Sequence, residues 1–318
     1  MFKKSKEIIW LALFSLLAFG LWGVNENAGS TGFNTLKTVY SARALALGQS
    51  LTGEARNPDG IFFNPAAILN VPGTEISSTY CNYFIDAQGG QLQLLLPKNK
   101  FSAWGFALRY MDFGKMERTE VDQFGNLVDD LGTFGAYNIS GSVTMSQFLS
   151  KALDAGGSVK FVYDQLDDAS AAAVVLDLGV IHHPVNERVK VGVSVRNLGF
   201  QISHYSDTKY KESMPFTFAA GGSYDFTDRH YASFEINKAN GENFNLRVGY
   251  EHTFSPFFQL RAGFRSNAGD YYSGGTLGYL SGLSLGAGWN WKNYRVDYAV
   301  SSYGDLGLVN QLTLGYDF

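Results

Sequence analysis

The stretch "VKVGVSVR", residues 189–196, alternates strictly between two kinds of side chain. Its valines share one face, and the other face carries Lys190, Gly192, Ser194 and Arg196. Because successive side chains of an extended chain point to opposite sides, the pattern predicts a strand with one apolar and one polar surface. Residues 258–265 and 311–318 show the same alternation. The fold therefore depends on which face of these strands points inward.

Residues 74–318 hold about fourteen such segments of roughly ten residues each. A soluble sandwich would bury their apolar faces, whereas a membrane barrel would turn them toward lipid. Strands of about ten residues match a tilted membrane crossing and exceed the five or six residues usual in soluble sheets. Short turns alternate with longer links in the outer-membrane manner, the turns at 97–100 and 292–293 and the links at 112–133, 199–213 and 266–281. We therefore predict an all-β protein, a transmembrane antiparallel β-barrel of about 14 strands over residues 74–318.

The N-terminus has the layout of a secretory signal peptide. Three lysines within the first six residues precede an apolar run from Ile8 to Trp22, and small residues follow around Ala28 to Ser30. The alternative is a single membrane anchor, but this run is shorter than the roughly 20 residues needed to span a bilayer. We predict a signal peptide over residues 1–29, with cleavage after Gly20 or near Ser30. The expected location is the cell outer membrane, in contact with its lipid, and the net charge of −4 gives no basic footprint for nucleic acid.

The segment between the signal and the first strand, residues 30–73, differs from the rest of the chain. It includes "NPDGIFFNPAAIL", residues 57–69, in which Asn64 is a suitable helix N-cap and Pro65 a suitable first helical residue. A barrel much larger than eight strands leaves a lumen that its own side chains do not fill. We predict that residues 30–73, lying on the periplasmic side of that opening, form a partly helical plug in the lumen. The alternative is a mobile periplasmic tail.

The same segment carries a family resemblance. "SARALALGQSLTGEARNPDGIFFNPAAIL", residues 41–69, and the closing hairpin, residues 294–318, resemble the PorV/PorQ family, relatives of the FadL fatty-acid channels. The N-terminal pattern is carried by Ser41, Ala42, Arg43, Leu47, Gly48, Asn64, Pro65 and Ala66. The resemblance implies a fourteen-stranded outer-membrane barrel with an N-terminal hatch. It also implies one of two functions, because PorV and PorQ types serve type IX secretion, whereas FadL types pass hydrophobic molecules through the hatch and a lateral opening.

We expect a non-enzymatic component of type IX-like secretion, whose outer loops bind cargo or secretion partners. The alternative is a FadL-like channel for long-chain fatty acids or other hydrophobic small molecules. The first is favoured because the inward face is rich in charge, glycine and serine, whereas a channel needs an apolar pocket between plug and wall. In the channel interpretation the plug or gate motif comprises Arg43, Gly48, Asn64, Pro65 and Ala66.

Charged residues occupy many lumen-facing positions of the predicted strands. They include Arg109, Lys160, Asp164, Asp177, Lys190, Arg196, Glu235, Arg247, Glu251, Arg261, Arg265, Arg295 and Asp297. Hairpin pairing places Glu235 opposite Arg247, Arg247 near Arg265, and Glu251 near Arg261. These five residues form either an anion or lipid-carboxylate site centred on the three arginines or, as we favour, a structural ladder that braces wall and plug.

Two further features bear on assembly and chemistry. The chain ends on Phe318, and we predict that Leu314, Tyr316 and Phe318 are read by the barrel-assembly machinery. "GLSLG", residues 282–286, matches a nucleophile motif, but Ser284 lies within an alternating strand rather than a strand–turn–helix elbow. The sequence has no P-loop or dinucleotide fingerprint. We therefore expect no enzyme activity, no cofactor and no metal site.

Overall fold

The computed structural model describes residues 29–54, 58–128, 131–267, 275 and 278–318. The predicted signal peptide, residues 1–29, lies outside these residues except for Gly29. No helix within the described ranges is both long and apolar enough to cross a membrane.

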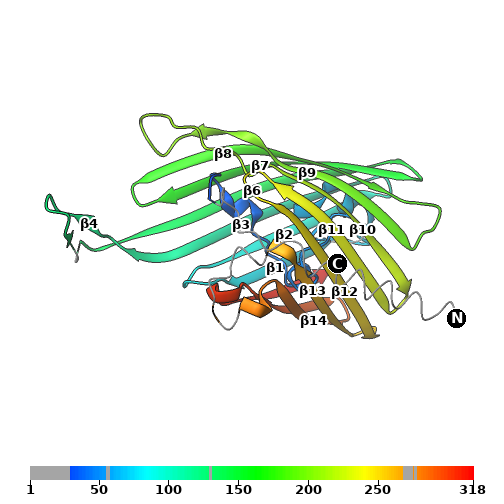
Figure 1. Ribbon diagram of the computed structural model, residues 1–318. Coiled ribbons are helices and arrows are strands. Elements are labelled where there is room, and N and C mark those ends of the chain that lie inside the picture. The colour runs from blue at the N-terminus through cyan, green and yellow to red at the C-terminus, as the bar shows by residue number, and fades with distance from the viewer. Residues whose placement is uncertain (1–28, 55–57, 129–130, 268–274, 276–277) are drawn as a thin grey trace.

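Fourteen strands of the described chain form one closed antiparallel barrel, in which the first strand pairs with the last (Figure 1). They are β1 (Glu75–Asn82), β2 (Gln88–Asn99), β3 (Ser102–Glu117), β6 (Thr133–Ser150), β7 (Leu153–Leu166), β8 (Ala169–His182), β9 (Val189–Ser203), β10 (Thr217–Thr227), β11 (His230–Ala239), β12 (Phe244–Ser255), β13 (Phe258–Arg265), β14 (Leu283–Trp291), β15 (Tyr294–Ser302) and β16 (Leu308–Asp317). Closure pairs the backbone polar groups between strands, which a sheet in hydrocarbon requires. The predicted fold is confirmed.

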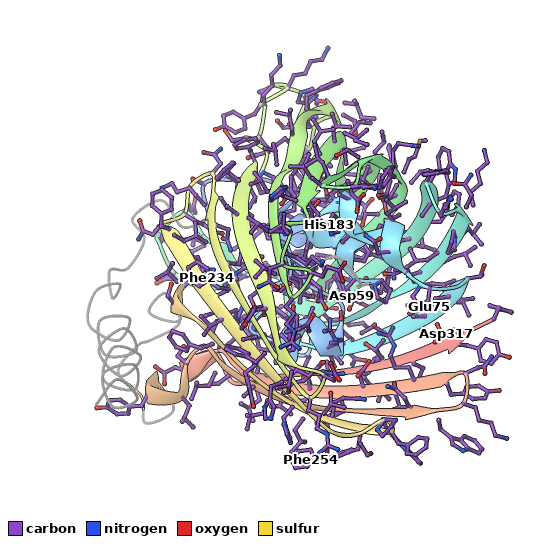
Figure 2. The ribbon with its side chains drawn as sticks, turned by 90° about the vertical axis from the view of Figure 1, so that its right-hand side faces the viewer. Asp59, Glu75, His183, Phe234, Phe254 and Asp317 are labelled. Atoms are coloured by element: carbon purple, nitrogen blue, oxygen red, sulfur yellow. The ribbon has the colours of Figure 1, made fainter. Side chains whose placement is uncertain are left out.

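The apolar faces of the strands point away from the lumen. In β9 the side chain of Val191 is exposed, whereas Gly192 and Ser194 on the opposite face are buried. Figure 2 shows the same division, with Asp59 inside the ring of strands and Phe234 and Phe254 on its outside. An apolar exterior around a polar lumen is the arrangement of a membrane barrel rather than a soluble sandwich.

Aromatic side chains gather near the short turns at one end of the barrel. Contacting rings there include the pairs Phe101–Phe148, Trp291–Tyr294 and Tyr316–Phe318. Outer-membrane barrels carry such aromatic girdles and have short periplasmic turns. We therefore call this the periplasmic end and the opposite end, with the longer loops, the outer end.

Several predicted connections are shorter or displaced in the structure. Much of the predicted link 112–133 is strand, because β3 and β6 extend past the other strands and a hairpin of β4 (Glu120–Val121) and β5 (Leu127–Val128) projects beyond the barrel (Figure 1). The turn predicted at 97–100 is also displaced, because β2 continues to Asn99. Pro97 is tolerated there because the β2–β3 register is irregular between Pro97 and Asn99.

The segment before β1 runs through the lumen along the barrel. It contains η1 (Asn34–Lys37), α2 (Ala42–Ala46), α3 (Gly60–Phe63) and η2 (Pro65–Asn70), and the outer loops contain η4 (Gly278–Leu280) and η5 (Gly304–Leu306). Near its start the Gly32 amide donates to the carbonyl of Ser213 in an outer loop, at 3.0 Å. At its end the side-chain amide of Asn70 donates to Asp154 at 2.9 Å, close to the periplasmic turn after β6.

The course of this plug differs in one respect from expectation. We expected residues 30–73 to lie on the periplasmic side, but the first of them lie at the outer end. Phe33 and Leu36 account for this, because both are buried there in a cluster with Val162, Val175 and Met214. The apolar side chains of the early plug thus find their burial against the long strands β7 and β8.

Candidate functional site

Two polar residues of the predicted motif region shape the plug backbone. Ser41 is the N-cap of α2, where its hydroxyl accepts from the amide of Ala44, and it donates to Asp59 at 2.6 Å. Asn64 caps η2 by accepting from the amide of Ala66, with Pro65 at the first helical position, as predicted. The Asn64 amide nitrogen donates to the carbonyls of Thr52 and Val180, so one side chain joins two plug turns to the wall.

Glycines of the wall allow the plug backbone to lie directly against the strands. A Cβ at Gly263 would overlap the amide of Gly48, which itself has a positive φ of +61°. The wall glycines that leave no room for a side chain beside the plug are Gly156, Gly179, Gly192, Gly249, Gly263 and Gly286. Many of the glycines on the inward face therefore form the bed of the plug.

At mid-barrel the plug is joined to the wall by a chain of alternating charges, here called the mid-barrel network. Arg43 of the plug binds both oxygens of Glu54, at 2.8 and 2.9 Å, and its Nε donates to Glu251 at 3.3 Å. The network continues through wall residues Arg261, Asp297, Arg295 and Glu75. The bidentate Arg43–Glu54 pair, a strong type of polar contact, braces the plug internally, and the contact with Glu251 links it to the wall.

Carboxylates outnumber arginines in this network. Arg43, Arg261 and Arg295 face Glu54, Glu75, Glu251 and Asp297, and the buried Asp59 lies close to Arg295 and Arg43. Burial alone would lower the pKa of Arg43, but Glu54 and Glu251 raise it well above its ordinary value. Burial raises the pKa of Asp59, against the opposing effects of Arg295, Ser41 and Arg43. The protonated form of Asp59 is thus stabilised relative to an exposed aspartate.

On the outer side of the plug lies a cavity of about 280 Å³, here called the outer chamber. The plug supplies part of its lining through Leu36, Val39 and Phe62, and β3 supplies Phe113. Six cationic residues also line it, namely Lys37, Arg109, Lys160, Arg196, Arg247 and Arg265. The chamber therefore offers an apolar surface and a concentration of positive charge side by side.

Three wall arginines of the outer chamber also hold the plug. Arg109 donates to the carbonyl of Thr38 at 3.1 Å, and Arg196 donates to that of Phe62 at 3.2 Å. Arg247 donates to the carbonyl of Gln49 at 3.3 Å. These carbonyls lie outside regular secondary structure or at its ends, so the arginines satisfy acceptors that the plug leaves open.

An irregularity in the wall adjoins the chamber. Between β8 and β9 the register shifts where Asp177 faces Arg196 and Asn197, and Asn197 has a φ of +59°. The Asn197 amide donates to Asp177, which also pairs with Lys160 at 2.6 Å. This bulge turns two consecutive side chains inward, which alternation along the sequence does not predict.

The predicted lumen cluster is divided between these two regions. The ladder pairs Glu235 with Arg247, Arg247 with Arg265, and Glu251 with Arg261, as the hairpins predicted. However, Glu251 and Arg261 belong to the mid-barrel network, whereas Arg247 and Arg265 line the outer chamber. Sequence reasoning placed Arg109, Lys160 and Arg196 on the inward face but did not group them with Arg247. The plug decides this grouping, and no local pattern records it.

Two further cavities lie on the periplasmic side of the plug. One, of about 310 Å³, is lined by Arg43, Glu54 and Glu251. The other, of about 900 Å³, lies among Asn70 and residues of the periplasmic turns such as His183. Plug residues 43–54 thus stand between the outer chamber and the inner cavities.

The C-terminal residues and the serine of the nucleophile-like motif both belong to the barrel wall. Leu314 and Phe318 are exposed on the outside of the barrel, and the Phe318 amide donates to the carbonyl of Thr74. Their reading by the assembly machinery, with that of Tyr316, stays a prediction. Ser284 lies within β14 and donates to Ser301 of β15 at 2.8 Å, a contact between two wall strands.

Comparison with known proteins shows the fold. No family model matches the sequence, and no curated protein matches it either. Among solved structures, the Pseudomonas putida toluene transporter TodX has a TM-score of 0.64 at 13% identity, covering 87% of this chain and 96% of that chain. The Ralstonia pickettii toluene transporter TbuX has a TM-score of 0.64 at 14% identity, covering 88% and 98%. A Pseudomonas aeruginosa FadL homologue has a TM-score of 0.54 at 12% identity, covering 88% and 99%.

At such identities the likeness concerns the backbone. It does not assign the chain to the PorV/PorQ family, so that resemblance stays a prediction. The chain has the closed, fourteen-stranded fold of FadL-like outer-membrane barrels.

Proposed function

We propose that this protein is an outer-membrane channel for small hydrophobic or amphipathic molecules. The observation that supports the proposal best is the outer chamber, a mixed apolar and charged cavity between plug and wall. Its volume, about 280 Å³, is near the lower end of the range for ligand pockets, about 300 Å³. The similar solved structures are toluene transporters and a FadL homologue, which favours transport over secretion.

Passage through such a channel requires the plug to move. Plug residues 43–54 separate the outer chamber from the inner cavities. Arg43 and Glu54, at the two ends of this stretch, form an ion pair. A molecule that enters from outside would rest in the chamber against Leu36 and Phe62. It would continue when this stretch of the plug shifts against its bed of wall glycines.

A reversible tether between plug and wall tests this proposal. The hydroxyl oxygens of Ser50 in the plug and Ser233 in β11 lie 2.6 Å apart, so Ser50→Cys with Ser233→Cys would place two thiols in contact. We expect oxidation of this variant to abolish uptake of labelled toluene and dodecanoate by cells that express it. Reduction should restore the uptake.

The chain offers a matched control for the tether. Ser284→Cys with Ser301→Cys would join two wall strands through a contact of the same kind and leave the plug free. Uptake by this control should not respond to oxidation, and the native Cys81 is buried. Undiminished uptake by the oxidised plug tether would contradict the proposal.

One observation supports the secretion role. The β4–β5 hairpin projects beyond the barrel and exposes Val121 and Phe124, as a protein-binding loop would. Replacing residues 120–128 with a glycine-serine turn should leave uptake unchanged if the protein is a channel. Loss of co-purifying secretion components or cargo from detergent extracts, with no uptake by the parent protein, would instead favour secretion.

A further inference from the structure

Arg109 is a buried cation whose charge is not balanced by its neighbours. Its side chain lines the outer chamber, yet the residue is only 6% exposed. Within the described ranges no carboxylate lies within ion-pair distance of it. Its guanidinium stacks on the ring of Phe62, at 3.7 Å from the centroid, and donates to the carbonyl of Thr38. Buried charges are normally paired, and a guanidinium does not lose its proton, so this position calls for an anion.

The charges around the whole chamber also indicate a position suited to an anion. Lys37 pairs with Glu242, Lys160 pairs with Asp177, and Arg196 and Arg247 share Glu235 at 3.8 and 3.3 Å. Arg265, the sixth cation of the lining, lies over the ring of Tyr303 and has further contacts, so it is left out of this balance. With Arg109, five cations therefore face three carboxylates among the described residues. Positive charge is therefore in excess among the described residues of the chamber.

Unused donors accompany this excess charge. The Nε groups of Arg109, Arg196 and Arg247 are buried and have no hydrogen-bond acceptor in the part of the chain that the structure describes. The three arginines come from three separate strands, β3, β9 and β12, and all line the one cavity. An unsatisfied buried donor costs about 1–3 kcal/mol, so the three arginines are not fully satisfied by the described residues.

We propose that the outer chamber binds a phosphate monoester headgroup through Arg109, Arg196 and Arg247. A phosphate monoester carries nearly two negative charges at neutral pH, so it balances more of this positive excess than a carboxylate, which supplies one. Its oxygens also suit the planar fork of a guanidinium. Leu36, Val39 and Phe62 provide an apolar surface for a chain attached to that headgroup. This inference rests on the proposed channel function and narrows its substrate class.

A series of probes with one tail and different heads tests the inference. Binding of dodecyl phosphate, dodecanoate, dodecanol and inorganic phosphate would be measured calorimetrically on the full chain in nanodiscs. We expect dodecyl phosphate to bind at least about tenfold more tightly than dodecanoate, and dodecanol most weakly. Affinity for dodecyl phosphate should rise with pH around the second phosphate pKa, about 6.

Two variants locate the site. Arg109→Gln should lower the affinity for dodecyl phosphate about tenfold or more and leave that for dodecanol unchanged. Arg118→Gln is the matched control, because it removes an arginine on the same side of the membrane that pairs with Asp167 outside the chamber. If Arg109→Gln does not fold, the ranking of the probes on the unchanged protein still tests whether the chamber prefers a phosphate headgroup.

The possible outcomes separate this inference from the channel function. Equal affinity for the phosphate, the carboxylate and the alcohol would overturn the inference but leave the channel intact. Failure of all tailed probes to bind, with no uptake in cells, would overturn the channel itself. Equal binding of inorganic phosphate and dodecyl phosphate would support the anion site and show that its ligand is the free anion.

Discussion

The mid-barrel network and the outer chamber are built from the same types of residue but have opposite charge balances. In the network, Arg43, Arg261 and Arg295 face an excess of buried carboxyl groups. Among the described residues of the chamber, cations exceed carboxylates, and Arg109 has no carboxylate partner. In both regions the wall contacts the plug, in the first through Glu251 and the Arg43 side chain and in the second through plug carbonyls.

An excess of carboxyl groups and an excess of arginines have different consequences. A carboxyl group in excess can take a proton from solvent, as the raised pKa of Asp59 indicates. An arginine in excess cannot release its proton, so its charge must be balanced by an anion. The acidic region can therefore adjust its charge by taking up a proton, whereas on our proposal the basic region is balanced by a bound anion.

The largest expected effect comes from removing the arginine of the closed network. Arg43→Met would leave the buried Glu54 without its partner and remove one of the two arginines that bind Glu251, which should lower the free energy of unfolding by about 3–5 kcal/mol. Urea titration of the protein in detergent measures this, and conductance in planar bilayers should rise as the plug loosens. Arg109→Met is the matched change in the chamber and should cost less than about 1 kcal/mol or stabilise the protein. Equal losses of stability for the two variants would show that the two regions do not differ in how well their charges are balanced.

A second prediction tests the bed on which the plug lies. Gly263→Ala would drive a methyl group into the backbone of Gly48, and we expect a loss of about 1–3 kcal/mol in stability together with higher conductance. Gly141→Ala is the control, since a Cβ there meets nothing within 4 Å. Similar behaviour of the two variants in urea titration and planar bilayers would show that the plug does not depend on this contact.

A third prediction increases the positive excess of the chamber. Glu235→Gln removes the carboxylate that Arg196 and Arg247 share but keeps an oxygen for the amide of Thr52. Dodecyl phosphate should then bind about tenfold more tightly, because a nearby competing negative charge is gone. Calorimetry on the variant and the unchanged protein gives the ratio. Weaker binding would mean that Glu235 positions the arginines rather than competing for them.

The smallest expected effect concerns Asp59 and pH. Its raised pKa means that the folded state holds the proton more tightly than the unfolded chain does. Its contribution to stability is therefore present below the unfolded pKa, about 3.9, and is lost as pH rises toward the folded value. Asp59→Asn lacks this dependence, so it should flatten the fall in stability over that window. Urea titrations from pH 4 upward measure the difference, and identical pH profiles for the two proteins would show that the pKa of Asp59 is the same in the folded and unfolded states.

The alternation along the chain was sufficient to determine the barrel and much of its lumen face. Period-two patterns place every second side chain on one surface, and a short turn sets which residues of a hairpin lie opposite each other. For this reason the pairs Glu235–Arg247 and Glu251–Arg261 could be predicted from sequence. The bulge at Asn197 could not, because one extra residue in a strand leaves no periodic signal.

The course of the plug and the division of the lumen charges were decided by tertiary structure. The plug meets the wall through contacts between residues far apart in the chain, such as the amide of Thr52 with Glu235 and that of Ser41 with Gln311. Sequence periodicity reports which face a side chain occupies, but it carries no information on which distant backbone lies across the lumen from it. Whether an inward arginine is paired in the network or left free to hold a ligand is therefore settled only when the plug is in place.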